Sequence, residues 1–332
     1  MRWRLALTGG SLLAISAAAL WLEGPQQHPS GIPTLTSCRL PVYLAQSKRG
    51  GFLSVPGYTF TEVPKNTFEG SAKAADSYWS YNALTARWLP VDYRMLSPDG
   101  KWWVYATPLD PPISGSAAVL LVDGNGAERT VWTGTGRAFP LGWTTGGAVF
   151  GYLGPAPQYE VGYRLIDPVT GKLRSLAIPP GEPVGVDSSS LWSTGDLAGV
   201  EPNKAPHATL LRTGIGGGAT ATWLDQVGLA IILVFGFDQH DRPILGLHSM
   251  NSPERYVLLT SPNTVTDFTT DAQASRFSPV TALGDSQGVW FGDTHGGVWR
   301  WTADLGLQLL AELGTPPTDR GFDVAVIAGP CR

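Results

Sequence analysis

The feature that most constrains the fold of this chain is a short strand pattern that recurs six times. Each copy is a run of apolar and aromatic residues: Leu40–Ala45, Trp102–Ala106, Ala148–Leu153, Leu191–Thr194, Pro243–His248 and Val289–Asp293. The copies follow one another at intervals of about 43 to 60 residues, a spacing typical of proteins built from repeated supersecondary units. We therefore predict one repeated β unit over most of the 332 residues.

Tight turns precede most of these strands and share their chemistry. The turns read SPDG, TTGG, DQHD and DSQG, with a looser fifth, DSSS: Ser97–Gly100, Thr144–Gly147, Asp238–Asp241, Asp285–Gly288 and Asp187–Ser190. Asp, Ser and Gly suit hairpin turns, which need positive φ or a side chain that bonds its own backbone. An apolar stretch lies before each turn, as in VDYRML, AFPLGW, EPVGV, LAIILVFGF and PVTAL. Each unit thus reads as strand A, tight turn, strand B, loop, strand C, turn and strand D.

This pattern predicts an all-β fold, a six-bladed β-propeller of four-stranded antiparallel blades. The first unit lacks a strand A before Leu40, whereas Asp323–Gly329 offers a strand A with no strand after it. A ring explains both facts, because the C-terminal strand can complete the N-terminal blade. A seventh blade is the alternative if Thr67–Pro90 contains a degenerate unit.

The two cysteines, Cys38 and Cys331, lie at opposite ends of the predicted propeller. Ring closure would place them where other blades have their A–B turn, so we expect a disulfide in place of that connection. A chain-entropy model gives such a long loop roughly 5 kcal/mol of stabilisation. The alternative is two unrelated buried thiols.

The first 24 residues are typical of an export segment. Arg2 and Arg4 precede an uncharged run to Leu22, and Ala17–Ala19 provides small residues for cleavage. The run also has about the length of a marginal membrane anchor, so signal peptide and retained anchor both stay open. Either one predicts an extracytoplasmic protein with residues 25–37 as a linker and residues 38–332 as the propeller. We expect no lipid anchor at Cys38.

SPDGKWWVYA, at Ser97–Ala106, resembles the signature of TolB-like propeller repeats, also called WD40-like or PD40 repeats. Only this unit matches the signature closely, while the other five keep the pattern of strands and turns. The resemblance implies a propeller in an extracytoplasmic setting. It carries over no catalytic residue, since such propellers serve as interaction platforms, ligand binders and occasionally enzymes.

Several motifs that suggest chemistry fail their context tests. Gly284–Gly288 matches G-x-S-x-G, but a strand follows Ser286 where a nucleophile elbow needs a helix. Gly214–Ala219 lacks the helix of a dinucleotide site, and Asp123–Glu128 lacks the Gly and Glu of a calcium loop. The net charge of −4, without a basic block, argues against nucleic-acid binding. No two histidines have metal-ligand spacing, so we predict no metal site, and the sequence identifies no cofactor.

Loop length distinguishes the two ends of the predicted strands. A–B and C–D turns are short, whereas several B–C and D–A connections are long, and in an antiparallel blade these long loops leave at the same end. We define this end as the loop-rich face and expect any binding site there. The candidate residues are Lys48, Arg49, Tyr159, His207, His248 and His295.

We expect a monomer that binds a protein, peptide or glycan through the loop-rich face. The alternative is a lyase or hydrolase with polar residues converging on the central channel. An enzyme would need ionisable groups brought close together, and the sequence shows no strong spacing for them.

Overall fold

The computed structural model describes residues 37–64, 78–107, 115–155, 160–195, 207–249, 252–270, 273, 275–314 and 323–332. They belong to one compact unit, Leu35–Arg332. The predicted export segment 1–24 and nearly all of the linker lie outside the described residues. Within the described part, no helix is long and apolar enough to cross a membrane.

The described strands form seven sheets, in which each strand pairs antiparallel with its neighbours. Sheet 1 has the order β25-β1-β2-β3, with bounds Ala325–Ile327, Cys38–Leu44, Arg49–Val55 and Phe60–Glu62. A two-stranded hairpin follows, made of β4 (Ser80–Asn82) and β5 (Arg87–Leu89). Sheet 2 contains three strands, β6 (Trp102–Thr107), β7 (Ser116–Asp123) and β8 (Glu128–Thr135).

Sheets 3 to 6 each contain four strands that pair in chain order. Sheet 3 comprises β9 (Arg137–Thr144), β10 (Gly147–Leu153), β11 (Val161–Ile166) and β12 (Leu173–Leu176). Sheet 4 comprises β13 (Glu182–Val186), β14 (Ser190–Thr194), β15 (His207–Gly214) and β16 (Thr220–Val227). Sheet 5 comprises β17 (Leu229–Phe237), β18 (Pro243–Ser249), β19 (Ser252–Ser261) and β20 (Thr264–Asp267). Sheet 6 comprises β21 (Pro279–Asp285), β22 (Gly288–Asp293), β23 (Gly297–Thr302) and β24 (Gly306–Glu312).

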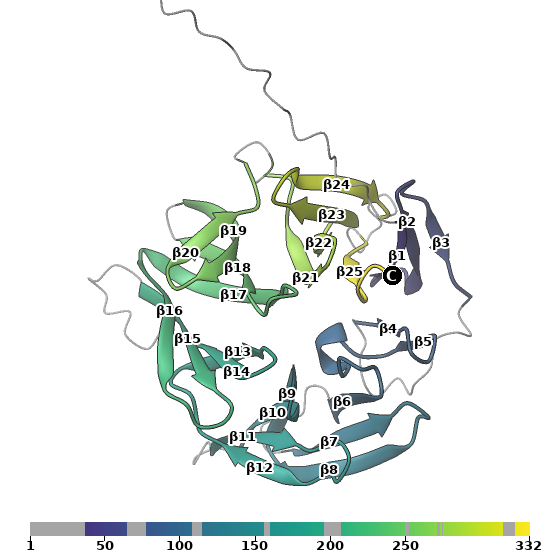
Figure 1. Cartoon of the computed structure of the whole chain (residues 1–332). Helices are drawn as coiled ribbons and strands as arrows, with labels where there is room; N and C mark the ends of the chain where they lie inside the picture. Colours follow the sequence, from purple (N-terminus) through teal and green to yellow (C-terminus); the bar gives the residue numbers. More distant parts are fainter. Residues whose placement is uncertain are drawn as a thin grey trace, which may run out of the picture. The chain divides into compact units, whose positions relative to one another are not determined.

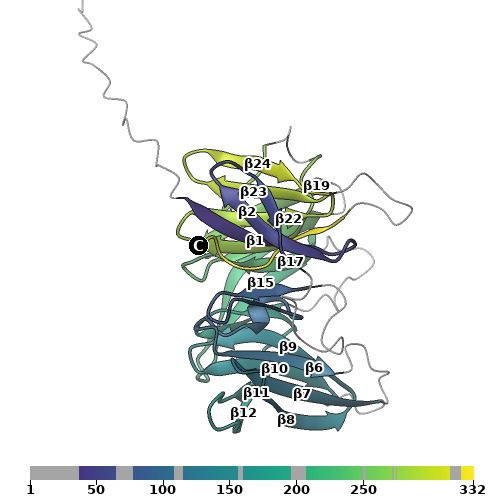
Figure 2. The same cartoon turned by 90° about the vertical axis from the view of Figure 1, so that its right-hand side faces the viewer.

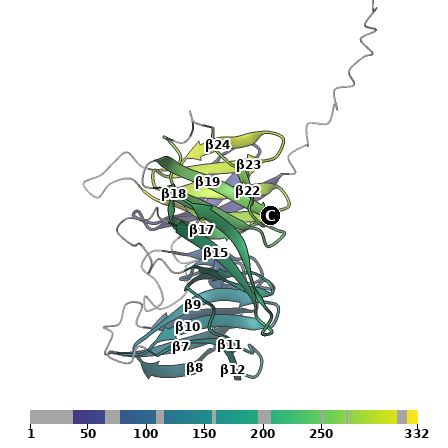
Figure 3. The same cartoon turned by 90° about the vertical axis from the view of Figure 1, so that its left-hand side faces the viewer.

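The sheets succeed one another in chain order, and sheet 6 packs on sheet 1 through β25 (Figure 1). The first strands of sheets 3 to 6 contact one another in turn, β9 with β13, β13 with β17 and β17 with β21. Figure 3 brings sheet 5 to the front, with sheet 3 in the same view. Repeated antiparallel sheets that pack side by side in this way are the architecture of a β-propeller.

The two ends of the described chain meet in sheet 1, as predicted. β25 pairs with β1 through Val42 and Ile327, and Cys38 and Cys331 form a disulfide with 5.4 Å between their Cα atoms. The backbone N–H groups of Arg39 and Arg332 donate to each other's carbonyl oxygens at 2.7 and 3.2 Å. Figure 2 shows the C-terminal end beside β1. The C-terminal strand therefore completes the sheet that the N-terminal strands begin.

Two features differ from the sequence-based expectation. VDYRML was predicted to be strand A of sheet 2, but Tyr93–Met95 forms a 3-10 helix, η2, and only Leu96 makes a β-bridge, to Trp103. The Asp92 side chain accepts a hydrogen bond from the backbone N–H of Arg94 and so favours a turn over a strand. Sheet 2 therefore has three strands, and the hairpin β4–β5 lies in the segment where a degenerate unit was considered.

Large aromatic side chains fill the space between neighbouring sheets. Between sheets 5 and 6, Phe277 packs edge-on against Phe291 and Tyr256 with ring centroids 5.1 Å apart. Trp192 and Trp290, on β14 and β22, are completely buried. Aromatic packing of this kind therefore joins neighbouring sheets of the described part.

Candidate functional site

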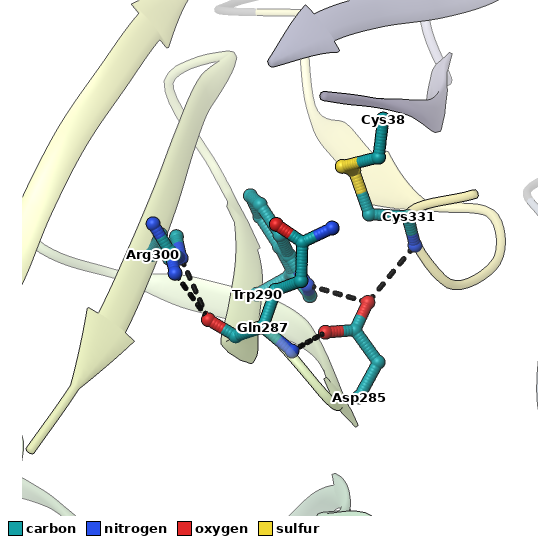
Figure 4. Close-up of a disulfide and its surroundings, with 6 residues drawn as sticks. All are labelled: Cys38, Asp285, Gln287, Trp290, Arg300 and Cys331. Carbon is teal, nitrogen blue, oxygen red and sulfur yellow. Dashed lines mark hydrogen bonds between the residues drawn. A yellow bond between two sulfur atoms is a disulfide. The ribbon is translucent and has the colours of Figure 1, made fainter. Parts of the chain in front are cut away.

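Ser286 lies in the hairpin turn between β21 and β22, so the G-x-S-x-G match is not a nucleophile elbow. Asp285 organises this turn, because its Oδ1 accepts from the Gln287 N–H and its Oδ2 accepts from the Trp290 indole, both at 2.8 Å (Figure 4). The turn of sheet 4 repeats the arrangement with Asp187 and Trp192. These aspartates stabilise the turns from within.

Lys48 ends the β1–β2 connection on the loop-rich face, and Arg49 begins β2. Lys48 is exposed and has a positive φ of 53°. Arg49 is held by two carboxylates, Glu62 at 3.6 Å and the buried Asp323 at 3.8 Å. Asp323 also accepts hydrogen bonds from the backbone of this connection, so Arg49 helps to fix the loops around it.

The other candidate residues lie on separate sheets. His207 begins β15 and pairs with Asp225 of β16, with both side chains about half exposed. His248 is exposed near the end of β18. Tyr159 lies outside the described residues. The ion pairs of His207 and Arg49 are each made with carboxylates of their own neighbourhood and join neither residue to another candidate.

His295 lines a hollow of about 290 Å³ at the loop-rich end of sheet 6. It lies in the β22–β23 turn, which the buried Asp293 supports by accepting hydrogen bonds from the backbone N–H groups of His295 and Gly297. The same carboxylate accepts from the Trp299 indole at 2.6 Å. The turn is therefore held firmly while the imidazole of His295 stays exposed.

The hollow combines a polar rim with an apolar floor. Arg276, from the connection before β21, approaches Glu312 of β24 to 4.0 Å, and both side chains are largely exposed. Trp299 and Leu309 contribute the apolar surface. Sequence reasoning missed Arg276 and Glu312, because 36 residues separate them and only the sheet brings them together. The one available signal was their place in the predicted unit, with Arg276 in a D–A connection and Glu312 in a strand D.

A second cavity, of about 120 Å³, lies against the first strands of sheets 5, 6 and 1 and against η2. Its apolar walls include Val234, Phe235, Val280, Leu283, Val326 and Ile327. The polar groups are Tyr78, Tyr93, Thr281 and the ion pair between Asp92 and Arg94, whose Oδ2 and Nη2 atoms are 2.9 Å apart. Sequence reasoning missed this pair because it treated the segment as a strand.

The ion pair determines the charge state of this cavity. Burial tends to raise the pKa of Asp92, but the charge and hydrogen bonds of Arg94 outweigh it and hold that pKa below its usual value. The charge of Asp92 in turn raises the pKa of Arg94. Burial also raises the pKa of Tyr93, against the opposing effect of Arg332. These shifts keep Asp92 and Arg94 charged and Tyr93 neutral near pH 7, so none of them is poised for proton transfer.

The described residues contain no cluster of three or more His, Cys, Asp or Glu side chains that could hold a metal ion.

Comparisons with known proteins found similar solved structures only. No protein-family model and no curated protein sequence matches the chain. The β-propeller domain of the Trilobed protease from Pyrococcus furiosus is 9% identical, covers 83% of this chain and 79% of its own, and has a TM-score of 0.49. The putative TolB from Agrobacterium tumefaciens is 12% identical, with coverage of 70% and 88% and a TM-score of 0.42. An oligogalacturonate lyase in complex with manganese is 11% identical, with coverage of 81% and 75% and a TM-score of 0.43. Likeness at this level assigns no activity to the chain.

Proposed function

We propose that this chain is an extracytoplasmic recognition module that binds a protein, peptide or glycan through its loop-rich face. In this proposal sheets 1 to 6 are the six blades of one ring, the hairpin β4–β5 is an insertion between the first two, and the protein acts as a monomer. The disulfide is compatible with an oxidising compartment outside the cytoplasm.

The observation that carries the proposal is the hollow beside His295. The exposed imidazole of His295 and the exposed side chains of Arg276 and Glu312, 4.0 Å apart, offer hydrogen-bond donors and acceptors around an apolar floor. Such a combination suits amphipathic ligands such as sugars and peptide side chains, which present both polar edges and apolar faces. The firmly bonded turn below His295 limits the entropy lost on binding.

The alternative, an enzyme with a polar site at the centre, finds less support. The described cavity at the first strands is lined by polar and apolar groups alike, but its ion pair is locked in the charged form. General acid–base catalysis needs a group whose pKa lies near the working pH. We therefore favour recognition.

The test is a binding screen of the full-length chain against a phage-displayed peptide library and a panel of soluble oligosaccharides. Each hit is then measured by calorimetry with a triple variant of the hollow, Arg276→Ala, His295→Ala and Glu312→Ala. We expect affinity to fall about tenfold or more, since the hydrogen bonds of charged groups are lost.

The matched control replaces three exposed residues at the opposite ends of the strands, Lys101→Ala, Asn125→Ala and Lys172→Ala. We expect this variant to bind as the parent chain does. A hit whose affinity falls only with the control variant would contradict the loop-rich face as the binding surface.

A further inference from the structure

Asp92 and Arg94 both line the cavity at the first strands, but they differ in how many hydrogen-bonding groups they leave unused for a ligand. Asp92 accepts three bonds from Arg94, namely from the backbone N–H at 2.9 Å, from Nε at 3.1 Å and from Nη2 at 2.9 Å. Both carboxylate oxygens are therefore already engaged. The acidic member of the pair has little capacity left to receive a donor.

The guanidinium of Arg94 keeps donors free. It carries five N–H groups, of which Asp92 engages two, and no other acceptor for it occurs among the described residues. Arg94 is exposed, with 39% of its side chain accessible, and it lines the cavity. The free N–H groups therefore have room to meet an acceptor that enters the cavity.

One part of the cavity wall is apolar and can receive the apolar body of a ligand. Val280 and Leu283 on β21 and Val326 and Ile327 on β25 form its walls. The volume of about 120 Å³ is somewhat below the roughly 150 Å³ of a dry cavity that holds benzene. A ligand of four or five carbon atoms with one acceptor group fits this combination of size and polarity.

We propose that this cavity binds a small monocarboxylate, with its carboxylate on Arg94 and its compact apolar body against Val280 and Val326. A carboxylate is favoured over a neutral carbonyl because bonds between two charged groups are shorter and stronger, and a planar guanidinium can hold both oxygens. The inference is independent of the function proposed for the loop-rich face, since the two sites share no lining residue.

The test uses isobutyrate as the probe and isobutyramide as its neutral analogue, with the full-length chain. Saturation-transfer NMR and methyl NOEs report contact between the probe and the methyl groups of Val280 and Val326. We expect isobutyrate to bind about tenfold or more tightly than isobutyramide, and Arg94→Gln to remove this preference. Arg94→Lys, which keeps the charge but loses the planar group, should recover part of the binding.

The matched control is Arg242→Gln, which breaks another Arg–Asp pair, with Asp238, in the β17–β18 turn and away from the cavity. It should leave isobutyrate binding unchanged. If Arg94→Gln does not fold, Val280→Phe fills the cavity while keeping the ion pair, and it should abolish binding. Equal binding of acid and amide, or unchanged binding after Val280→Phe, would overturn the proposal. The triple variant of the hollow should bind isobutyrate normally, so the two proposals can fail separately.

Discussion

The carboxylate of Asp285 accepts a hydrogen bond from the backbone N–H of Cys331, with 2.9 Å between Oδ2 and N. The same oxygen accepts from the indole of the buried Trp290, and the other oxygen accepts from Gln287 in the turn (Figure 4). One side chain of sheet 6 thus holds its own turn, a core indole and the disulfide that closes sheet 1. The junction between the last and first sheets depends on polar contacts as well as on the covalent bond.

We expect Asp285→Asn to destabilise the protein by about 1–3 kcal/mol, because the amide has one acceptor oxygen for three donors and leaves buried N–H groups unbonded. Urea unfolding followed by tryptophan fluorescence measures the change. The control is Asp123→Asn in the β7–β8 turn, where one oxygen accepts from the exposed Asn125 and Ala127 N–H groups. Its cost should stay below about 0.5 kcal/mol. Equal losses in the two variants would show that Asp285 has no special role at the junction.

Removing the disulfide with Cys38→Ala and Cys331→Ala should lower the free energy of unfolding by about 2–5 kcal/mol. The two cysteines are 293 residues apart, so the bond restricts the unfolded chain over nearly the whole domain. Urea unfolding of the oxidised parent chain, the reduced parent chain and the double variant provides the measurement. The reduced parent and the variant should agree. A variant as stable as the oxidised parent chain would mean that the backbone pairing of β1 and β25 is sufficient.

Much of the strand order could be predicted from the sequence because turn chemistry and apolar runs coincide. Each of the six repeated strands lies in an observed strand to within one residue, and the pairing of β1 with β25 follows from one missing and one surplus strand. The predicted strand at VDYRML is wrong, because an apolar run does not show whether a side chain will bond the local backbone and favour a turn. The Asp92 side chain bonds the next turn of backbone, and this interaction outweighs the strand propensity of the neighbouring residues.

The candidate site was less predictable, because its parts come from distant segments. His295 could be placed on the loop-rich face from its position after a strand, whereas its neighbours Arg276 and Glu312 depend on how sheet 6 folds. Asp92 and Arg94 are two residues apart, so along a strand they would share one face of the sheet, roughly 7 Å apart. In η2 the Asp92 carboxylate instead bonds both the backbone N–H and the guanidinium of Arg94.

Alkaline pH should destabilise the protein through its buried tyrosines. Burial raises the pKa of Tyr93, Tyr105, Tyr163 and Tyr256, with Glu128 and Glu254 adding to the effect at Tyr105 and Tyr256. In the unfolded chain tyrosine ionises near about pH 10. The folded chain keeps these phenols protonated to higher pH, so unfolding releases protons and the free energy of unfolding falls as pH rises above about 10.

Urea unfolding between about pH 8 and pH 11, with tyrosinate absorbance recorded in parallel, measures this dependence. The free energy should be nearly constant at the lower end and should decline at the upper end. Tyr105→Phe removes one of the four groups and should reduce the decline, which separates tyrosine ionisation from the loss of lysine charge. A decline of the same size in that variant would assign the effect to other groups.

The first strands of sheets 5 and 6 approach each other closely enough to require a glycine. A Cβ atom at Gly236 of β17 would lie 2.2 Å from the backbone oxygen of Ala282 in β21, so Gly236→Ala must separate the two sheets. We expect a cost of about 1–3 kcal/mol, as for other overpacked sites. Gly216→Ala, in the β15–β16 turn, is the matched control, because its Cβ would meet no atom within 4 Å and its φ is not in the left-handed region. That variant should be neutral or up to about 1 kcal/mol more stable, through a smaller entropy of the unfolded chain. Urea unfolding of both variants tests the packing directly, since equal stabilities would mean that sheets 5 and 6 do not meet backbone to backbone in solution.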